Sequence, residues 1–131
     1  MSTAKDGDTY TLRVGKGSRT TFEVECVVSG PKKQRGLSGR AQLPSGKGML
    51  FIFDSVARQS MWMIEMKFPL DIVWLDENFT VVHISYNCEP CKSAADCPSY
   101  SSKFRVKYAI EMTAGEANSN GFAIGKQLFV V

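Results

Sequence analysis

A clear alternation of apolar and polar residues over 21–28 restricts the fold more than any other feature of this sequence. Its apolar members recur at every second position and are Phe22, Val24, Cys26 and Val28. Because successive side chains of a β-strand point to opposite faces, this spacing predicts a strand with one buried face. The strand is expected to end at Ser29-Gly30-Pro31, where the residues favour a turn.

Further short apolar runs predict that the whole chain is mainly β. With 21–28, the expected strands cover 10–14, 49–53, 60–66, 70–75, 79–85, 105–112 and 128–131. About eight strands separated by frequent turns, with two short helices, favour a small barrel or two packed sheets.

Local signals add detail to this arrangement. The sequence Asp76-Glu77-Asn78 is typical of a tight turn and predicts an antiparallel hairpin on either side of it. Alternation within 105–112 predicts a half-exposed strand with Glu111 on its polar face. The two short helices are expected over 32–37 and 114–120, each followed by glycine.

The length of 131 residues favours one domain over 1–131, because two halves would each be too small to bury a good core. Residues 1–9 are polar and are expected to form a disordered tail. No apolar stretch approaches the roughly 18 residues of a membrane span, and the first ten residues lack the apolar region of a signal peptide. We expect a soluble monomer or weak dimer that folds without a cofactor and that is exported only if a leader was trimmed.

The charge distribution does not favour a nucleic-acid partner. The formal net charge is only +3. One segment, 31–48, is basic without any acid, and its charged residues are Lys32, Lys33, Arg35, Arg40 and Lys47. Since no aromatic residue that could stack on a base is interleaved with them, the segment is interpreted as a solvated face.

Four motifs, in this order, resemble the domain-of-unknown-function family 192. They are Gln34-Arg35-Gly36-Leu37, then Gly48-Met49-Leu50-Phe51-Ile52-Phe53, then Trp62-Met63 with Phe68-Pro69-Leu70-Asp71-Ile72, and finally Ala109-Ile110-Glu111-Met112 with Ala114-Gly115. The resemblance extends from about residue 13 to 130. It implies a compact β-rich fold without an established activity, often on exported proteins. The chain departs from the family pattern at Ser38 and at Ile64-Glu65.

The family motifs contain a charged pair and an aromatic residue, which suggest a binding site. Arg35, Trp62, Met63 and Asp71 could surround a shallow site for a small polar ligand, a glycan or a peptide. Each residue also has a structural interpretation. Asp71 could be a buried carboxylate satisfied by backbone N–H groups or by Arg35. For Trp62, burial in the core is the favoured expectation.

Catalysis is the alternative to binding, although we do not expect the chain to be an enzyme. A carboxylate-based site would use Asp71 with Glu65 or Glu111. No nucleophile-serine motif, metal-binding histidine pair or glycine-rich phosphate loop is present. His83 is the single histidine and is interpreted as an ordinary surface or hydrogen-bonded side chain. A purely structural domain that stabilises a partner is the third hypothesis.

Three of the four cysteines lie close together in one loop. The fourth, Cys26, is expected to be an inert core thiol. A disulfide between Cys91 and Cys97 would leave Cys88 free, and similar paired cysteines occur in some members of the resembling family. Reduced thiols, or a zinc site that adds His83, are the alternatives. A redox pair of Cys88 and Cys91 is a remote option, because such pairs normally open a helix.

Overall fold

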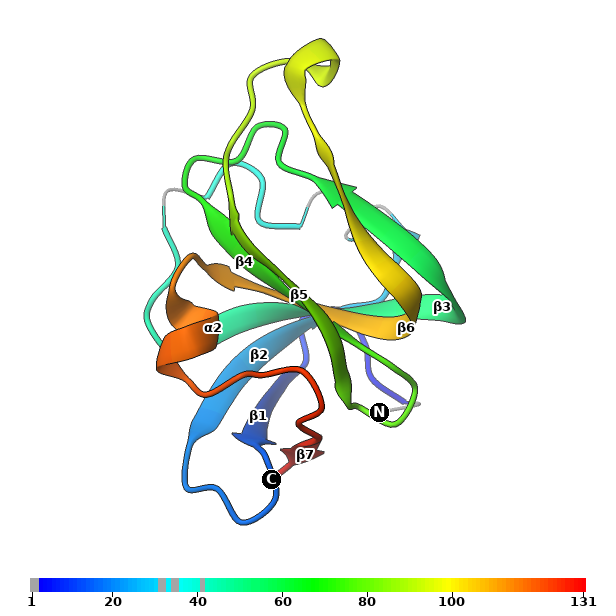
Figure 1. Cartoon of the computed structure of the whole chain (residues 1–131), viewed down its shortest axis with the longest axis vertical. Coiled ribbons are helices and arrows are strands. Elements are labelled where there is room, and N and C mark those ends of the chain that lie inside the picture. The colour runs from blue at the N-terminus through cyan, green and yellow to red at the C-terminus, as the bar shows by residue number, and fades with distance from the viewer. Residues whose placement is uncertain (1–2, 31–32, 34–35, 41) are drawn as a thin grey trace.

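The computed structural model describes residues 3–30, 33, 36–40 and 42–131 and confirms a mainly β fold (Figure 1). Its strands are β1 Thr9–Val14, β2 Thr21–Val27, β3 Lys47–Trp62, β4 Leu70–Leu75, β5 Val81–Cys88, β6 Ser99–Thr113 and β7 Leu128–Val130. The described helices are the 3₁₀ turn η1 Ala94–Asp96 and the single-turn α2 Glu116–Ser119.

All seven strands of the described residues form one sheet with the order β5-β4-β6-β3-β2-β1-β7. The pair β2 and β3 is parallel, whereas the other neighbouring strands are antiparallel. The sheet curves into a half-barrel, and its two edges meet at one end. There the Val81 N–H donates to the Lys126 carbonyl at 2.8 Å, and the Leu128 N–H donates to the Phe79 carbonyl at 2.9 Å.

The expectation of about eight strands is wrong by one, because 49–53 and 60–66 do not form separate strands. Strand β3 runs without a break from Lys47 to Trp62, and its pairing with β6 shifts register twice between Ile52 and Ser60. Such irregularities let a long strand bend while it keeps its partner. After Trp62 the chain leaves the sheet and turns at Glu65, whose φ is 61°.

The predicted hairpin and the second helical turn are confirmed. Strands β4 and β5 pair antiparallel, and Asp76 Oδ1 accepts the N–H groups of Asn78 and Thr80 at 2.9 and 3.0 Å. Helix α2 follows Gly115, whose φ of 95° few side chains tolerate. Of the helix expected over 32–37, residues 32, 34 and 35 lie outside the described residues.

Buried residues form two hydrophobic clusters, and the central strand β6 contributes to both. Ile110 and Met112 pack into one cluster, and Ala109 packs into the other. Because alternate residues of a strand share a face, Glu111 lies on the same side as Ala109. The expectation that Glu111 is exposed is therefore wrong, and only 5% of its surface is accessible. The reason is that β6 is covered on both faces.

The described part of the polar N-terminal stretch contacts the end of β2. The Gly7 N–H donates to the Cys26 carbonyl at 3.0 Å, and Asp6 Oδ1 accepts the Val28 N–H at 2.6 Å. These bonds hold residues 6–8 of the expected tail beside the sheet. The few short helices among the described residues include none that could cross a membrane.

Candidate functional site

Asp71, one of the predicted ligand contacts, is a buried structural carboxylate with 1% of its surface accessible. Its Oδ1 accepts the Asn87 N–H at 2.9 Å, and its Oδ2 accepts the N–H groups of Gly115 and Ala117 at 2.9 and 3.1 Å. The interpretation that backbone N–H groups satisfy Asp71 is confirmed. Arg35, its other expected partner, lies outside the described residues.

Trp62 and Met63 point to opposite faces, as the alternation predicts, but the burial of Trp62 is a wrong expectation. Trp62 is 49% exposed, whereas Met63 is fully buried in the core. Trp62 is the last residue of β3 and pairs there with Ser99, the first residue of β6. The core tryptophan is Trp74, which has no accessible surface.

A cavity of about 250 Å³ lies beside Trp62. The rings of Phe51, Phe53 and Trp62 line it, together with the charged side chains of Lys33 and Glu111. Met63 and Asp71 are absent from its lining. Among the described residues, the structure therefore brings one of the four predicted binding residues, Trp62, to the candidate site and adds Glu111.

Glu111 is the most unusual group in this cavity. Its Oε1 is buried and has no hydrogen-bond partner among the described residues. Burial raises the pKa of Glu111 from 4.5 to about 7, although the nearby backbone N–H of Leu37 opposes part of this rise. A carboxyl group that titrates near neutrality in a cavity is a recognised mark of a functional site.

Gly36 is needed beside this carboxyl group. A Cβ atom at this position would lie 3.2 Å from Glu111 Oε1 and 3.0 Å from the ring of Phe51, and Gly36 has a φ of +49°. Both the close approach and the backbone conformation favour glycine. Gly36 and the following Leu37 thus form part of the cavity wall.

Lys33, the other charged residue of the cavity, has partners of its own. Its ammonium donates to the Ile52 carbonyl at 3.2 Å, lies 3.5 Å from Asp54 and stands 5.8 Å from the centre of the Phe53 ring. Further along the basic segment, Arg40 pairs with Glu25 at 3.4 Å and Lys47 pairs with Glu23 at 3.8 Å. The described basic residues of this segment are therefore matched by carboxylates.

The carboxylates proposed for an enzyme are not close partners. Glu111 pairs with Ile72 across the sheet, and the preceding residue of β4, Asp71, pairs with Met112. Asp71 and Glu111 therefore point to opposite faces. Glu65 lies in an exposed turn and does not line the cavity.

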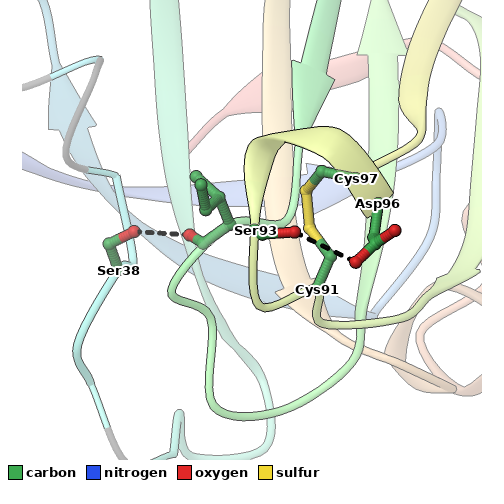
Figure 2. Close-up of a disulfide and its surroundings, with 6 residues drawn as sticks. Ser38, Cys91, Ser93, Asp96 and Cys97 are labelled. Atoms are coloured by element: carbon green, nitrogen blue, oxygen red, sulfur yellow. Dashed lines mark hydrogen bonds between the residues drawn. A yellow bond between two sulfur atoms is a disulfide. The ribbon is translucent and has the colours of Figure 1, made fainter.

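The cysteine loop contains a disulfide between Cys91 and Cys97, with their Cα atoms 5.2 Å apart (Figure 2). Cys26 and Cys88 are free and buried. Burial raises the pKa of Cys26 to about 11 and that of Cys88 to about 12, which disfavours the reactive thiolate form of both. In the described part of the chain no cluster that could hold a metal is found, and His83 lies on β5 with a pKa lowered mainly by burial.

The disulfide loop also supports the cavity wall. The Cys91 N–H donates to the Met63 carbonyl at 3.3 Å, and Cys91 forms a bridge with Ile64. The Ser38 hydroxyl donates to the Ile64 carbonyl at 3.1 Å, and Figure 2 shows Ser38 in the same region as the disulfide. Ile64 and Ser38 both line the cavity.

Oxidised protein that is denatured without reductant should show two reactive thiols, from Cys26 and Cys88. The Cys91→Ser/Cys97→Ser variant should lose no more than about 2 kcal/mol of unfolding free energy, because the closed ring is short. Its Trp62 emission should nevertheless change, since the loop supports the neighbouring turn. Thiol titration counts the reactive thiols, and denaturant unfolding followed by tryptophan fluorescence measures the free energy and the emission. Four reactive thiols in oxidised protein would contradict the disulfide.

The Glu111→Gln variant should remove a pH dependence of stability. The pKa of Glu111 is raised in the folded state. Its contribution to the free energy of unfolding of the wild-type protein is therefore largest below about pH 4.5 and is lost as the pH rises through about 7. The neutral glutamine has no such loss. The variant should therefore gain roughly 2 to 4 kcal/mol relative to wild type between about pH 4 and pH 8, measured by urea unfolding. If the variant and the wild-type protein differ in unfolding free energy by the same amount at about pH 4 and at about pH 8, the pKa of Glu111 is not raised.

Comparisons with known proteins place this fold and site in context. The model of the DUF192 family, described as "Uncharacterized ACR", matches residues 11–130. A solved structure of a candidate transcription regulator from Sinorhizobium meliloti 1021 is 26% identical, with a TM-score of 0.85 over 97% of each chain. A protein of unknown function from Novosphingobium aromaticivorans DSM 12444 is 22% identical, with a TM-score of 0.81 over 91% of this chain and 83% of that one, and shares the fold. The comparison with curated proteins found no match.

Proposed function

This chain belongs to the uncharacterised DUF192 family, and we propose that it is a small binding module whose site is the cavity between Trp62 and Glu111. The ligand is a small polar molecule with an apolar part. The rigid half-barrel holds the site, and the chain acts by binding rather than by catalysis.

The Glu111 carboxyl oxygen that has no hydrogen-bond partner among the described residues carries this proposal. A buried polar atom without a hydrogen bond costs about 1 to 3 kcal/mol of stability. Other buried carboxylates of a protein are normally satisfied, as Asp71 is by three backbone N–H groups. A ligand that donates a hydrogen bond to Glu111 would offset this cost when it binds.

Trp62 supplies the apolar side of the same site. A tryptophan that is 49% exposed loses contact with core atoms and leaves much of its ring in water. At the edge of a cavity it can instead cover a ligand, and tryptophan is among the residues most often found at binding hot spots. Phe51 and Phe53 extend the apolar lining inward.

Protein-observed NMR with a panel of small alcohols, amides, amines and acids tests the proposal. Compounds that bind should shift the Trp62 indole N–H and the amides of Ser38 and Ile64, with millimolar affinity typical of such small molecules. The Trp62→Ala variant should weaken binding. Phe104→Ala is the matched control, because Phe104 is 55% exposed and lies outside the cavity lining. If no compound of the panel shifts the NMR resonances of the cavity residues, the proposal is overturned.

Two other functions have less support. An enzyme with two carboxylates would need Asp71 to approach either Glu65 or Glu111, and their positions do not favour this. Regulation of transcription is suggested by the description of the Sinorhizobium relative. The ion pairs of Lys33, Arg40 and Lys47 speak against a free basic face for nucleic acid.

A further inference from the structure

We infer that the cavity selects an organic cation, a small primary ammonium compound with an apolar or aromatic body, which pairs with Glu111 while its body packs on the aromatic rings of the cavity. This inference rests on the proposed function and specifies the chemical class of its ligand. It makes Glu111 the group that recognises the charged end of the ligand and Trp62 the group that covers the other end.

The charge of the ligand follows from the burial of Glu111. A neutral donor such as a hydroxyl group would satisfy a lone pair of the carboxylate but would not neutralise its buried negative charge. An ammonium group would supply both a hydrogen bond and the opposite charge, and charge-assisted hydrogen bonds are about twice as strong as neutral ones. The carboxylate of Glu111 would repel an anionic head group at short range.

The aromatic lining is a second feature that suits an organic cation. The rings of Phe51, Phe53 and Trp62 line the same cavity, and the faces of aromatic rings attract cations. The chain already shows such a contact, because the Lys33 ammonium stands 5.8 Å from the centre of the Phe53 ring. The cavity of about 250 Å³ can hold one substituted benzene ring, since an apolar cavity of about 150 Å³ is known to bind benzene.

Within the part of the chain that the structure describes, the other charged and titratable groups near Glu111 do not remove this preference. Lys33 lines the cavity, but its ammonium is 3.5 Å from Asp54 and bonded to the Ile52 carbonyl. The thiol of Cys88 senses the charges of both Glu111 and Asp71 and stays neutral, with a pKa of about 12. Asp71 points to the other face of the sheet and is satisfied by backbone N–H groups.

Benzylammonium, benzyl alcohol and benzoate test the inference, since they share a ring and differ only in head group. Titrations followed by NMR or calorimetry should rank benzylammonium about tenfold tighter than benzyl alcohol near pH 8. That advantage should disappear near pH 5, where Glu111 is protonated and benzylammonium is still charged. The Glu111→Gln variant, which keeps the size of the side chain, should bind the amine and the alcohol equally at both pH values.

The possible failures are distinguishable. If benzyl alcohol binds at Trp62 as tightly as the amine at both pH values, the cation inference is wrong and the binding module stands. Tighter binding of benzoate would also overturn the inference and would identify Lys33 as the recognition group. If none of the three shifts the cavity resonances while other panel compounds do, the inference alone fails. A Glu111 carboxyl titration by NMR at or below pH 4.5 would mean that the chain itself neutralises Glu111, and would overturn the inference as well.

Discussion

Replacement of Trp74 by alanine is expected to lower the free energy of unfolding by about 3 to 5 kcal/mol, whereas the same replacement of Trp62 should cost less than about 1 kcal/mol. Trp74 has no accessible surface, while Trp62 is 49% exposed. The Trp74 Nε1–H also donates to the Ser85 hydroxyl at 3.1 Å, and the alanine variant loses this bond together with the packing.

Urea unfolding of the two variants, read by circular dichroism, compares the same chemical change at two sites. Trp74→Phe is a useful intermediate, because it keeps most of the ring volume and loses the hydrogen bond, so its cost should be smaller than that of alanine. Similar losses for Trp62→Ala and Trp74→Ala would contradict the exposure of Trp62 and would remove the apolar edge of the candidate site.

Replacement of Asp71 by alanine is expected to cost about 3 to 5 kcal/mol, a loss comparable to that of breaking a buried ion pair. The substitution leaves the N–H groups of Asn87, Gly115 and Ala117 without their acceptor. The first group lies near the end of β5, and the other two lie at the start of α2. Loss of the acceptor should therefore loosen both segments against β4. Hydrogen exchange should accelerate at all three amides.

The matched control for Asp71 is Glu77→Ala, which removes an exposed carboxylate from the β4–β5 turn and should change stability by about 0.5 kcal/mol or less. Asp71→Asn gives a finer test. The amide retains one acceptor oxygen but turns its NH₂ group toward backbone donors, so this variant should also be clearly destabilised. A stable Asp71→Asn protein with unchanged amide exchange would show that the three hydrogen bonds contribute little.

Much of the fold could be predicted because it depends on local patterns. The strand from Thr21, the turn at Asp76 and the glycine-flanked helical turn near Gly115 each follow from residues within one short segment. The length of β3 could not be predicted in this way. Its polar residues near Asp54 look like a break in sequence, yet the strand continues because β6 stays paired beside it through the register shifts.

The candidate site was less predictable, because burial is set by the neighbours of a strand. Trp62 and Trp74 both lie in strand-like segments, but Trp62 ends β3 and is exposed, whereas Trp74 lies within β4 and is buried. For Glu111 a signal was present, since it stands alone among apolar residues in Ala109-Ile110-Glu111-Met112. That signal becomes informative only when β6 is known to be central and covered on both faces.

The contact between the two edges of the sheet affects how the protein behaves in a crowded solution. Exposed edge strands offer free N–H and carbonyl groups to other chains and promote aggregation. Here the hydrogen bonds of Val81 with Lys126 and of Leu128 with Phe79 occupy part of both edges within the molecule itself. The short final strand, only three residues long, thus leaves fewer free backbone groups at this end of the sheet for a strand of another molecule to pair with.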